Sequence, residues 1–201
     1  MSKISALIKT IGRPTLQRAI DSAEREGMRP IVVSDGFPLY DEETGELKVG
    51  GAYSVLELKK NWGCYGAAAA NAGVALCDTD WLLILDDDDE LAKGAGDIIR
   101  SRINYSPHID IWIPGLLFNN GMVLCDGSNK AVQPGNVAVP IARVECFTDA
   151  PFRSKVPEKF KDYADFFQIQ EMHSMGHTIG WIGEPIYLVR PHLEGTNGRG
   201  K

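Results

Sequence analysis

Apolar and polar residues alternate along the first part of the chain in a pattern that predicts a strand, a helix and a second strand. The apolar run at residues 4–9 has the length of a buried strand. After Pro14, apolar residues recur at helical spacing with polar residues on the other face, and Gly27 supplies the stop, which predicts a helix. The apolar residues 31–34 predict a second strand before Asp35. This order indicates a parallel, right-handed crossover unit.

The rest of the chain continues the alternation, with one weakly patterned stretch at residues 128–157, where frequent proline and glycine yield no order of elements. Polar and turn-forming residues at 37–51 predict a surface hairpin or excursion. The alanine-rich residues 65–76 predict a helix, and WLLIL at residues 81–85 predicts a central parallel strand because it is apolar throughout. Further elements are expected at residues 91–103 (a weaker helix), 110–118 and 121–127 (strands), 162–176 (a final helix) and 179–190 (a pair of strands).

This order of elements favours an α/β fold with a mainly parallel sheet flanked by helices. A chain of 201 residues suits one domain and is long enough to bury a sizeable core. Residues 193–201 are polar and glycine-rich, so we expect them to form a mobile tail.

Composition narrows the class of protein. With 44% hydrophobic and 24% charged residues, and without an apolar run near the length that spans a bilayer, no membrane span is expected. The N-terminus has no apolar core followed by a cleavage site, and the four cysteines form no CxxC pair, which together favour a reduced, cytoplasmic protein without a zinc cluster or dense disulfides. A net charge of −6 gives no broad cationic field for nucleic acid.

Four consecutive aspartates, residues 86–89, directly follow the predicted strand WLLIL. Such charges repel one another unless a cation or hydrogen-bond donors hold them. Ligands of open α/β sheets lie beyond the carboxyl ends of strands, where this run begins. Alternate side chains of an extended segment point the same way, so Asp86 and Asp88 should face one ligand while Asp87 points elsewhere. Because Mg²⁺ and Mn²⁺ prefer carboxylate and phosphate oxygens, the run predicts a divalent metal that carries a nucleotide diphosphate.

Two other interpretations of the run stay open. The first is a solvated acidic turn that caps the next helix, because aspartates favour helix N-termini. The second is a phosphatase or nucleotidyltransferase, since an apolar strand before Asp-x-Asp also resembles the haloacid-dehalogenase phosphatases. Those enzymes usually have threonine or valine where Glu90 stands, and the pyrophosphorylase loop L-x-x-G-x-G-x-R is missing from the start of the chain.

Four segments together resemble the family 2 glycosyltransferases, which have the GT-A fold. The segments are IKTIGRPTLQRAIDSA, IVVSDG, AAAANAGVALCDTDWLLILDDDDEL and GEPIYLVRPH, in that order. The resemblance covers about residues 3–100 and 136–192. It implies a single GT-A catalytic domain over residues 1–201, with a nucleotide-sugar-binding half at 1–100 and an acceptor-side half at 101–192.

The resemblance also implies the residues that hold the metal and the donor. Asp88 and His192 are the implied ligands of Mn²⁺ or Mg²⁺, and Asp89 is either a further ligand or a helix cap. A carboxylate can accept a hydrogen bond from a uracil-type base, and arginine suits phosphate. The implied donor-binding residues are Thr10, Arg13, Asp35, Asn71, Asp86, Asp87 and Arg190.

Asp165 is the catalytic base that the resemblance implies, in an Ala164–Asp165 pair where the family usually has Glu-Asp. It would take the proton of an acceptor hydroxyl as that oxygen attacks the anomeric carbon opposite the departing diphosphate, which inverts the configuration. Asp162 is the rival for this role, because an insertion of one helical turn would exchange the two.

The sequence therefore predicts a metal-dependent, inverting glycosyltransferase that moves a sugar from a nucleotide sugar, with UDP as the expected nucleotide, to an acceptor hydroxyl of unknown class. Nucleic acid enters only as an acceptor, since so small an enzyme would fit a virus that glycosylates modified DNA bases. The alternative from another class is an inactive nucleotide- or metal-binding module on the same scaffold, motivated by Ala164 and by Ala70, which precedes Asn71 where the family often has arginine.

Overall fold

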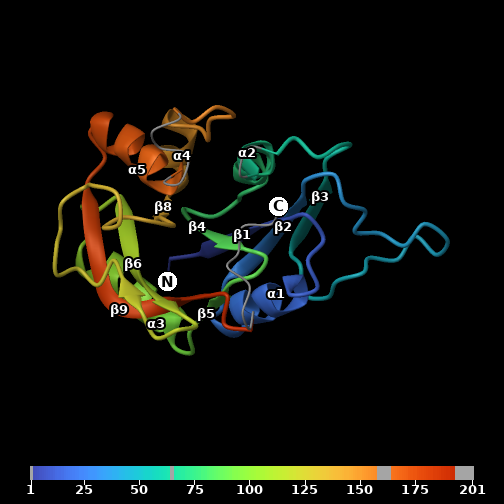
Figure 1. Ribbon diagram of the computed structural model, residues 1–201, viewed down its shortest axis with the longest axis horizontal. Coiled ribbons are helices and arrows are strands. Elements are labelled where there is room, and N and C mark those ends of the chain that lie inside the picture. Colours follow the sequence, from blue (N-terminus) through green and yellow to red (C-terminus); the bar gives the residue numbers. More distant parts are fainter. Residues whose placement is uncertain (1, 64–65, 158–163, 193–201) are drawn as a thin grey trace.

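The computed structural model describes residues 2–63, 66–157 and 164–192. Its strands are β1 (Ile4–Thr10), β2 (Arg29–Ser34), β3 (Ser54–Glu57), β4 (Trp81–Asp86), β5 (Glu90–Leu91), β6 (Ile111–Phe118), β7 (Val123–Leu124), β8 (Ile141–Arg143) and β9 (Ile179–Val189). Among the described residues they form one sheet in the order β3-β2-β1-β4-β8-β6-β9-β5, with β7 paired to β6 (Figure 1). The helices are α1 (Leu16–Arg25), α2 (Ala67–Ala75), α3 (Ala95–Tyr105), α4 (Val144–Asp149) and α5 (Ala164–Ser174).

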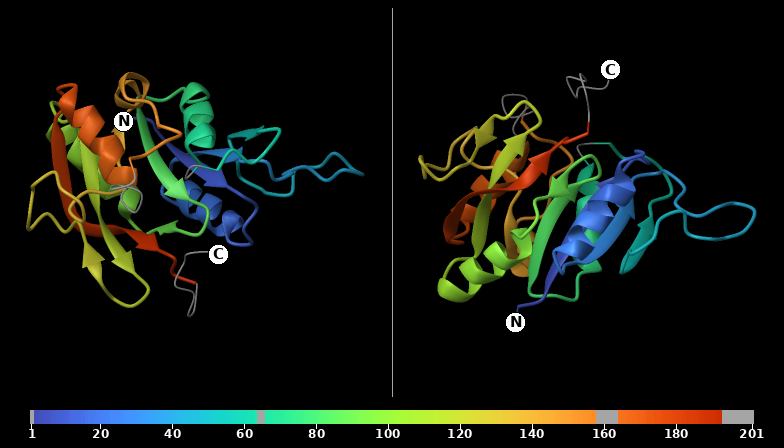
Figure 2. Two further views of the ribbon diagram at one scale, coloured as in Figure 1. Left: turned by 45° about the horizontal axis from the view of Figure 1, so that its top comes forward. Right: turned by 90° about the horizontal axis from the view of Figure 1, so that it is seen from below.

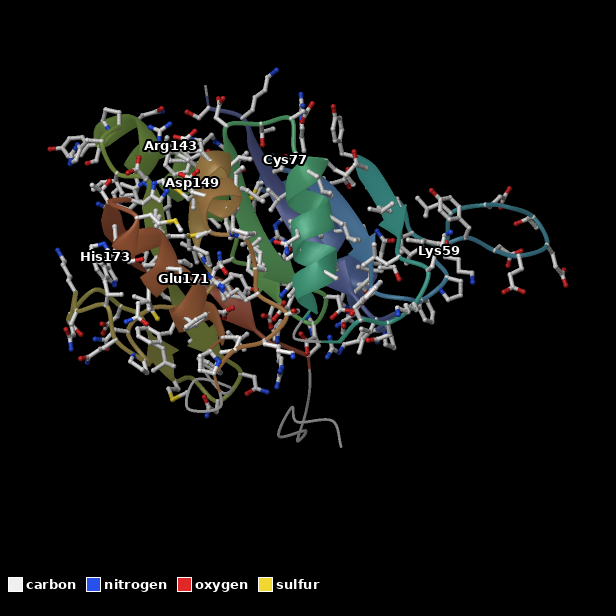
Figure 3. The ribbon with its side chains drawn as sticks, turned by 90° about the horizontal axis from the view of Figure 1, so that it is seen from above. Lys59, Cys77, Arg143, Asp149, Glu171 and His173 are labelled. Carbon is white, nitrogen blue, oxygen red and sulfur yellow. The ribbon has the colours of Figure 1, made fainter. Side chains whose placement is uncertain are left out.

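The sheet is covered on both faces. Helices α2, α4 and α5 lie on one face, and α1 and α3 lie on the other (Figures 1 and 3). Because helices enclose it from both sides, β4 is buried from Trp81 to Leu85 and can be apolar at every position, as its sequence predicts. No helix of the described residues is long and apolar enough to cross a membrane.

The N-terminal half has the predicted parallel topology. β1 pairs in parallel with both β2 and β4, and β2 pairs in parallel with β3. Helix α2 approaches β1 closely because it has Gly73 there, where a Cβ atom would lie 2.1 Å from Leu7 Cδ1. Residues 37–51 project from the rest of the molecule, with a bridge between Tyr40 and Leu47, so the predicted excursion is confirmed (Figure 2).

The structure differs from the sequence-based prediction in several places, most of them in the C-terminal half. The expected strand pair at residues 179–190 is wrong: β9 is one long strand, parallel to β6, with register shifts near Gly115. Strand β8, which lies antiparallel between β4 and β6, and helix α4 fall within the stretch that gave no order. Strand β3 was also not predicted. The predicted parallel sheet is therefore confirmed for β1 to β4 and becomes mixed beyond β4.

Strand β9 also brings the end of the described chain to the aspartate run. Leu188 of β9 pairs with Glu90 of β5, and Tyr187 pairs with Leu91. Residues 190–192 therefore lie beside residues 86–90, although about a hundred positions separate them in sequence. The predicted tail at residues 193–201 lies outside the described residues.

Asn71 fastens α2 to the segment that follows α4. Its side chain accepts a hydrogen bond from the backbone N–H of Phe152 at 2.9 Å and donates one to the carbonyl of the same residue at 2.8 Å. Both ends of the amide are thus engaged within the protein, and the predicted contact of Asn71 with a donor stays a prediction.

We expect Asn71→Ala to lower the free energy of unfolding by roughly 1–2 kcal/mol, because it removes both hydrogen bonds to Phe152. Urea denaturation measures the change. Asn104→Ala, at an exposed position of α3, is the matched control and should be close to neutral. Unchanged stability with a loss of nucleotide affinity would instead favour a direct contact between Asn71 and the donor.

Candidate active site

The carboxyl end of β4 carries a cluster of three carboxylates. Oxygens of Asp86, Asp88 and Asp89 lie within 4.8 Å of one another. The chain turns here, with the N–H of Asp89 donating to the carbonyl of Asp86 at 3.1 Å, before β5 begins. The structure thus agrees with the expectation that Asp86 and Asp88 face one place, and it brings Asp89, expected as a further ligand or a helix cap, into the same cluster. Helix α3 begins at Ala95, its N-cap residue is Gly94, and no side chain caps it, so a capping role for the run is wrong.

Asp87 points away from this cluster and organises the loop between β1 and α1. It is fully buried, and it accepts hydrogen bonds from the Thr10 hydroxyl at 2.6 Å and from the N–H of Ile11 at 3.3 Å. Its other oxygen forms an ion pair with Arg13. Three of the predicted donor-binding residues, Thr10, Arg13 and Asp87, therefore lie together at the ends of neighbouring strands.

Three cationic side chains from different parts of the chain neutralise the aspartates. Lys9 Nζ lies 3.1 Å from Asp86, and Arg190 Nε lies 3.1 Å from Asp88. Arg13 Nε lies 3.8 Å from Asp88. The backbone N–H of Arg190 also donates to Asp89 at 2.9 Å, and it does so at a φ of 47°, an unusual conformation for arginine that this contact helps to hold.

The protein environment shifts the pKa values of the three clustered carboxyls in different directions. The ion pair with Lys9 lowers the pKa of Asp86 below its ordinary value. Burial raises the pKa of Asp88, against the opposing effect of Arg13 and Arg190. Burial and the charge of Asp86 raise the pKa of Asp89 to about 8, although it also accepts a hydrogen bond from Tyr187. A pKa of about 8 favours the protonated form of Asp89 at neutral pH.

These residues fit a hard divalent cation. Mg²⁺ and Mn²⁺ bind carboxylate oxygens, and three such oxygens converge here. A bound cation would favour the ionised forms of Asp88 and Asp89, which burial otherwise disfavours. His192 Nε2 lies 2.7 Å from Glu90, next to the run, and its predicted role as a metal ligand stays a prediction.

Asp35 lies at the end of β2, where its backbone N–H donates to the Thr10 carbonyl at 2.8 Å. Its buried carboxylate accepts hydrogen bonds from the backbone N–H groups of Trp62 at 2.8 Å and Gly63 at 3.1 Å. Both oxygens thus hold the loop after β3, and the predicted contact between Asp35 and a nucleobase stays a prediction.

Asp165, the predicted base, lies in the first turn of α5 and is exposed to solvent. Desolvation by the surrounding protein raises its pKa, Lys9 opposes this, and Asp86 adds to it. The N–H of Val139 donates a hydrogen bond to its carboxylate. Asp165 is therefore within electrostatic reach of both members of the Lys9–Asp86 pair. The rival Asp162 lies outside the described residues.

Sequence reasoning missed Lys9 and Tyr187. Burial alone lowers the pKa of Lys9, but Asp86, Asp165 and Asp87 together raise it above the ordinary value. The Tyr187 hydroxyl accepts a hydrogen bond from the N–H of Asp86 at 3.1 Å. The available signal for Lys9 was a lysine near the carboxyl end of a strand that is otherwise mostly apolar.

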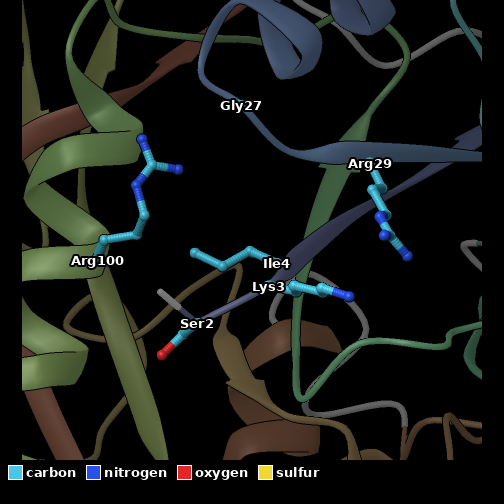
Figure 4. A pocket seen from close by; sticks show the side chains of 6 residues that line it. All are labelled: Ser2, Lys3, Ile4, Gly27, Arg29 and Arg100. Atoms are coloured by element: carbon cyan, nitrogen blue, oxygen red, sulfur yellow. The ribbon is translucent and has the colours of Figure 1, made fainter.

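A separate recess lies at the opposite, amino-terminal end of β1 (Figure 4). Its arginines are already paired, Arg29 with Asp78 and Arg100 with Asp97. It is lined by Ser2, Lys3, Ile4, Gly27, Arg29 and Arg100. This recess therefore lies apart from the carboxylates at the carboxyl edge of the sheet.

Comparison with known proteins agrees with the geometry. The sequence model of "Glycosyl transferase family 2" matches residues 5–97. The fold is similar to that of S. aureus TarS 1-349, with a TM-score of 0.69 and 16% identity over 93% of this chain and 60% of that one. It is also similar to the mannosyltransferase PcManGT from Pyrobaculum calidifontis, described in complex with GDP-Man and Mn²⁺, with a TM-score of 0.67 and 13% identity over 96% of this chain and 58% of that one.

Another TarS structure, in complex with UDP-GlcNAc, has a TM-score of 0.68 and 17% identity over 93% of this chain and 58% of that one. The present chain thus spans about 60% of the length of TarS 1-349. No curated protein matches it in sequence. The predicted GT-A fold is confirmed. The resemblance to family 2 is confirmed for residues 5–97, which include the aspartate run and the first turn of α3.

The raised pKa of Asp89 predicts how the stability of the metal-free protein depends on pH. Its pKa of about 8 in the folded protein lies above the ordinary 3.8. As the pH rises, the Asp89 carboxyl therefore ionises in the unfolded chain at a lower pH than in the folded protein. Asp89 therefore destabilises the fold progressively as the pH rises between these two values. We expect Asp89→Asn, measured with a chelator present, to gain stability over the wild type across this window.

Denaturant unfolding at several pH values across the window tests this expectation. Asp126→Asn is the matched control: hydrogen bonds from Ser128 lower the pKa of that carboxyl, so its removal should bring no such gain. Equal stability of wild type and Asp89→Asn throughout the window would contradict the assignment of a buried, protonated Asp89.

Proposed function

Because residues 5–97 match the sequence model of glycosyl transferase family 2, we propose that this chain transfers a sugar from a nucleotide-sugar donor to an acceptor hydroxyl with inversion of configuration. The observation that carries the proposal is the group of Asp86, Asp88 and Asp89 oxygens within 4.8 Å at the carboxyl end of β4, with Asp165 in electrostatic reach of it. A candidate cation site and a candidate catalytic base thus lie at the same edge of the sheet.

The proposed donor lies across the carboxyl ends of β4, β1 and β2. Asp86, Asp88 and Asp89 hold a divalent cation, Mn²⁺ or Mg²⁺, with His192 as a further proposed ligand. Such an ion, when bound, neutralises the negative charge that grows on the departing diphosphate. Arg190 and Arg13, which form ion pairs with the aspartates, are near enough to contact phosphate oxygens.

UDP is the proposed nucleotide. The fold is shared both with a TarS structure in complex with UDP-GlcNAc and with a mannosyltransferase in complex with GDP-Man. The nucleoside would lie towards Thr10 and Asp35, at the ends of β1 and β2. Residues 101–192 form the proposed acceptor side, because they contribute Asp165 and the strands beyond β4.

In the proposed reaction Asp165 accepts the proton of the acceptor hydroxyl. The acceptor oxygen then forms a bond to the anomeric carbon while the bond from that carbon to the diphosphate oxygen breaks on the opposite face. Desolvation by the surrounding protein raises the pKa of Asp165, which makes it a stronger base, and Lys9 limits the rise so that the carboxylate form remains accessible. Lys9 is thus a proposed positioning residue for both Asp86 and Asp165.

An inactive nucleotide-binding module is the alternative of a different class. Ala164, which stands before Asp165 where the family usually has glutamate, is the observation that favours it. A modified nucleobase is the alternative acceptor within the enzyme hypothesis. Nucleotide binding without any sugar transfer distinguishes the module from the enzyme.

Replacing the base tests the mechanism. We expect Asp165→Asn to lower the rate of donor turnover by about 10² to 10⁴-fold, because proton removal from the acceptor is lost, while UDP affinity stays unchanged. Release of nucleoside diphosphate from UDP-GlcNAc, UDP-glucose and GDP-mannose, with a panel of acceptors, measures the rate.

The matched control is Asp149→Asn, at an exposed carboxylate at the end of α4 that pairs with His177 (Figure 3). It should leave turnover unchanged. Turnover by Asp165→Asn at the wild-type rate would exclude Asp165 as the base and would direct attention to Asp162.

Removing one carboxylate of the cluster tests the metal site. We expect Asp88→Asn to weaken Mn²⁺ binding about tenfold or more, a loss of about 1.4 kcal/mol or more, because an uncharged amide replaces a carboxylate oxygen. Calorimetric titration with Mn²⁺, alone and with UDP, measures this affinity. Asp97→Asn, on the exposed surface of α3, is the control and should bind Mn²⁺ as the wild type does. Equal Mn²⁺ affinity of both variants would place the metal elsewhere.

A further inference from the structure

Trp62 is an exposed aromatic residue at the same edge of the sheet as the aspartates. Its surface is 55% exposed, whereas Trp81 and Trp112 are 2% and 6% exposed. A large apolar ring in water is normally buried or covered, so an exposed and firmly held tryptophan points to a ligand. The function proposed above uses no residue of the loop that carries it.

The loop of Trp62 is held in place by the carboxylate of Asp35. Asp35 is 3% exposed and accepts hydrogen bonds from the N–H groups of Trp62 and Gly63 at 2.8 and 3.1 Å. The same loop rests on Gly36, where a Cβ atom would lie 2.2 Å from the backbone nitrogen of Asn61. Gly36, with a φ of +83°, therefore allows a contact that any side chain would prevent.

The ring of Trp62 is also fixed on one side. Lys60 Nζ lies 4.0 Å from the ring centroid, in the position of a cation–π contact. This contact leaves more than half of the residue's surface in solvent. The side chain is thus held before any ligand arrives, which lowers the entropy that ordering it would cost.

Two further exposed apolar side chains lie on neighbouring loops. Ile11, after β1, is 50% exposed, and Phe37, after β2, is 39% exposed. The Phe37 ring covers Gly12, where a Cβ atom would lie 2.4 Å from it. We refer to Ile11, Phe37 and Trp62, which follow β1, β2 and β3 in turn, as the apolar platform.

The platform lies at a suitable distance from the aspartates for one nucleotide to reach both. Strands β4, β1 and β2 are consecutive in the sheet, so the ends of β4 and β2 are two strand spacings apart, roughly 10 Å. The ribose that joins a nucleobase to its diphosphate gives the nucleotide a comparable reach. The Thr10 hydroxyl donates a hydrogen bond to Asp87, and the N–H of Asp35 donates one to the Thr10 carbonyl, so Thr10 connects the two positions.

We propose that Trp62 stacks on the nucleobase of the donor, with Ile11 and Phe37 beside it, and that Asp35 supports this contact by fixing the Trp62 loop. This inference rests on the proposed function, since it takes the donor to be a nucleoside diphosphate sugar. Asp35 then acts on the nucleobase through Trp62, which differs from the direct hydrogen bond expected from the sequence.

Nucleotide titrations of two variants test the proposal. UDP should quench the tryptophan fluorescence of the wild type in the presence of Mn²⁺, and Trp62→Phe should lose this quenching while it keeps most of the affinity. We expect Trp62→Leu, which is apolar but not aromatic, to bind UDP about tenfold more weakly. Inorganic pyrophosphate, which has no base to stack, should bind both variants as it binds the wild type.

Tyr105→Ala, at an aromatic residue of α3 that is 88% exposed, is the control variant. Its affinity for UDP should match that of the wild type.

The outcomes separate this inference from the function on which it rests. Wild-type UDP affinity in Trp62→Leu would overturn the stacking role and leave the metal and donor site intact. An equal loss of UDP and pyrophosphate binding would also overturn it, because the effect of Trp62 would then not depend on the base. If neither UDP nor GDP binds the wild type with Mn²⁺, the proposed function fails and this inference fails with it. Retained pyrophosphate binding by Trp62→Leu also shows that the variant is folded.

Discussion

The structure depends on the neutralisation of four adjacent aspartates at the end of its central strand. Carboxylates this close repel one another, and a buried one such as Asp87 is stable only when it is paired and hydrogen-bonded. The cations come from separate places: Lys9 from β1, Arg13 from the loop after it, and Arg190 from the end of β9. The electrostatics of one strand end therefore hold together the first loop, the turn after β4 and the last described residues of the chain.

This arrangement divides one edge of the sheet into two chemically different regions. At β4 the edge is charged, with carboxylates whose pKa values burial has raised and with arginines beside them. Beyond β1 the edge is apolar, because Ile11, Phe37 and Trp62 are exposed there. A nucleotide has the same division, with an anionic diphosphate at one end and a flat base at the other. Thr10, hydrogen-bonded towards both regions, lies between them.

The comparisons place these features in a wider fold. At 13% to 17% identity to the TarS and PcManGT structures, the shared property is the sheet and its helices. On this scaffold, the described residues of the present chain form the Lys9–Asp86 ion pair, the hydrogen bonds between Asn71 and Phe152, and the hydrogen bonds from the Trp62 loop to Asp35.

The sequence by itself determined the elements of the N-terminal half, apart from β3 and β5, and the position of the acidic site. Apolar periodicity and the uninterrupted run WLLIL are local signals, and a run of charges at the end of a buried strand marks a ligand edge wherever the strand lies. Only the tertiary structure decided the rest: the place of β8 between β4 and β6, the continuity of β9, and the partners of Asp35, Asn71 and Lys9. These depend on contacts between residues as far as about a hundred positions apart, such as Arg190 with Asp88, and no local pattern records which distant chain segment will meet a given side chain.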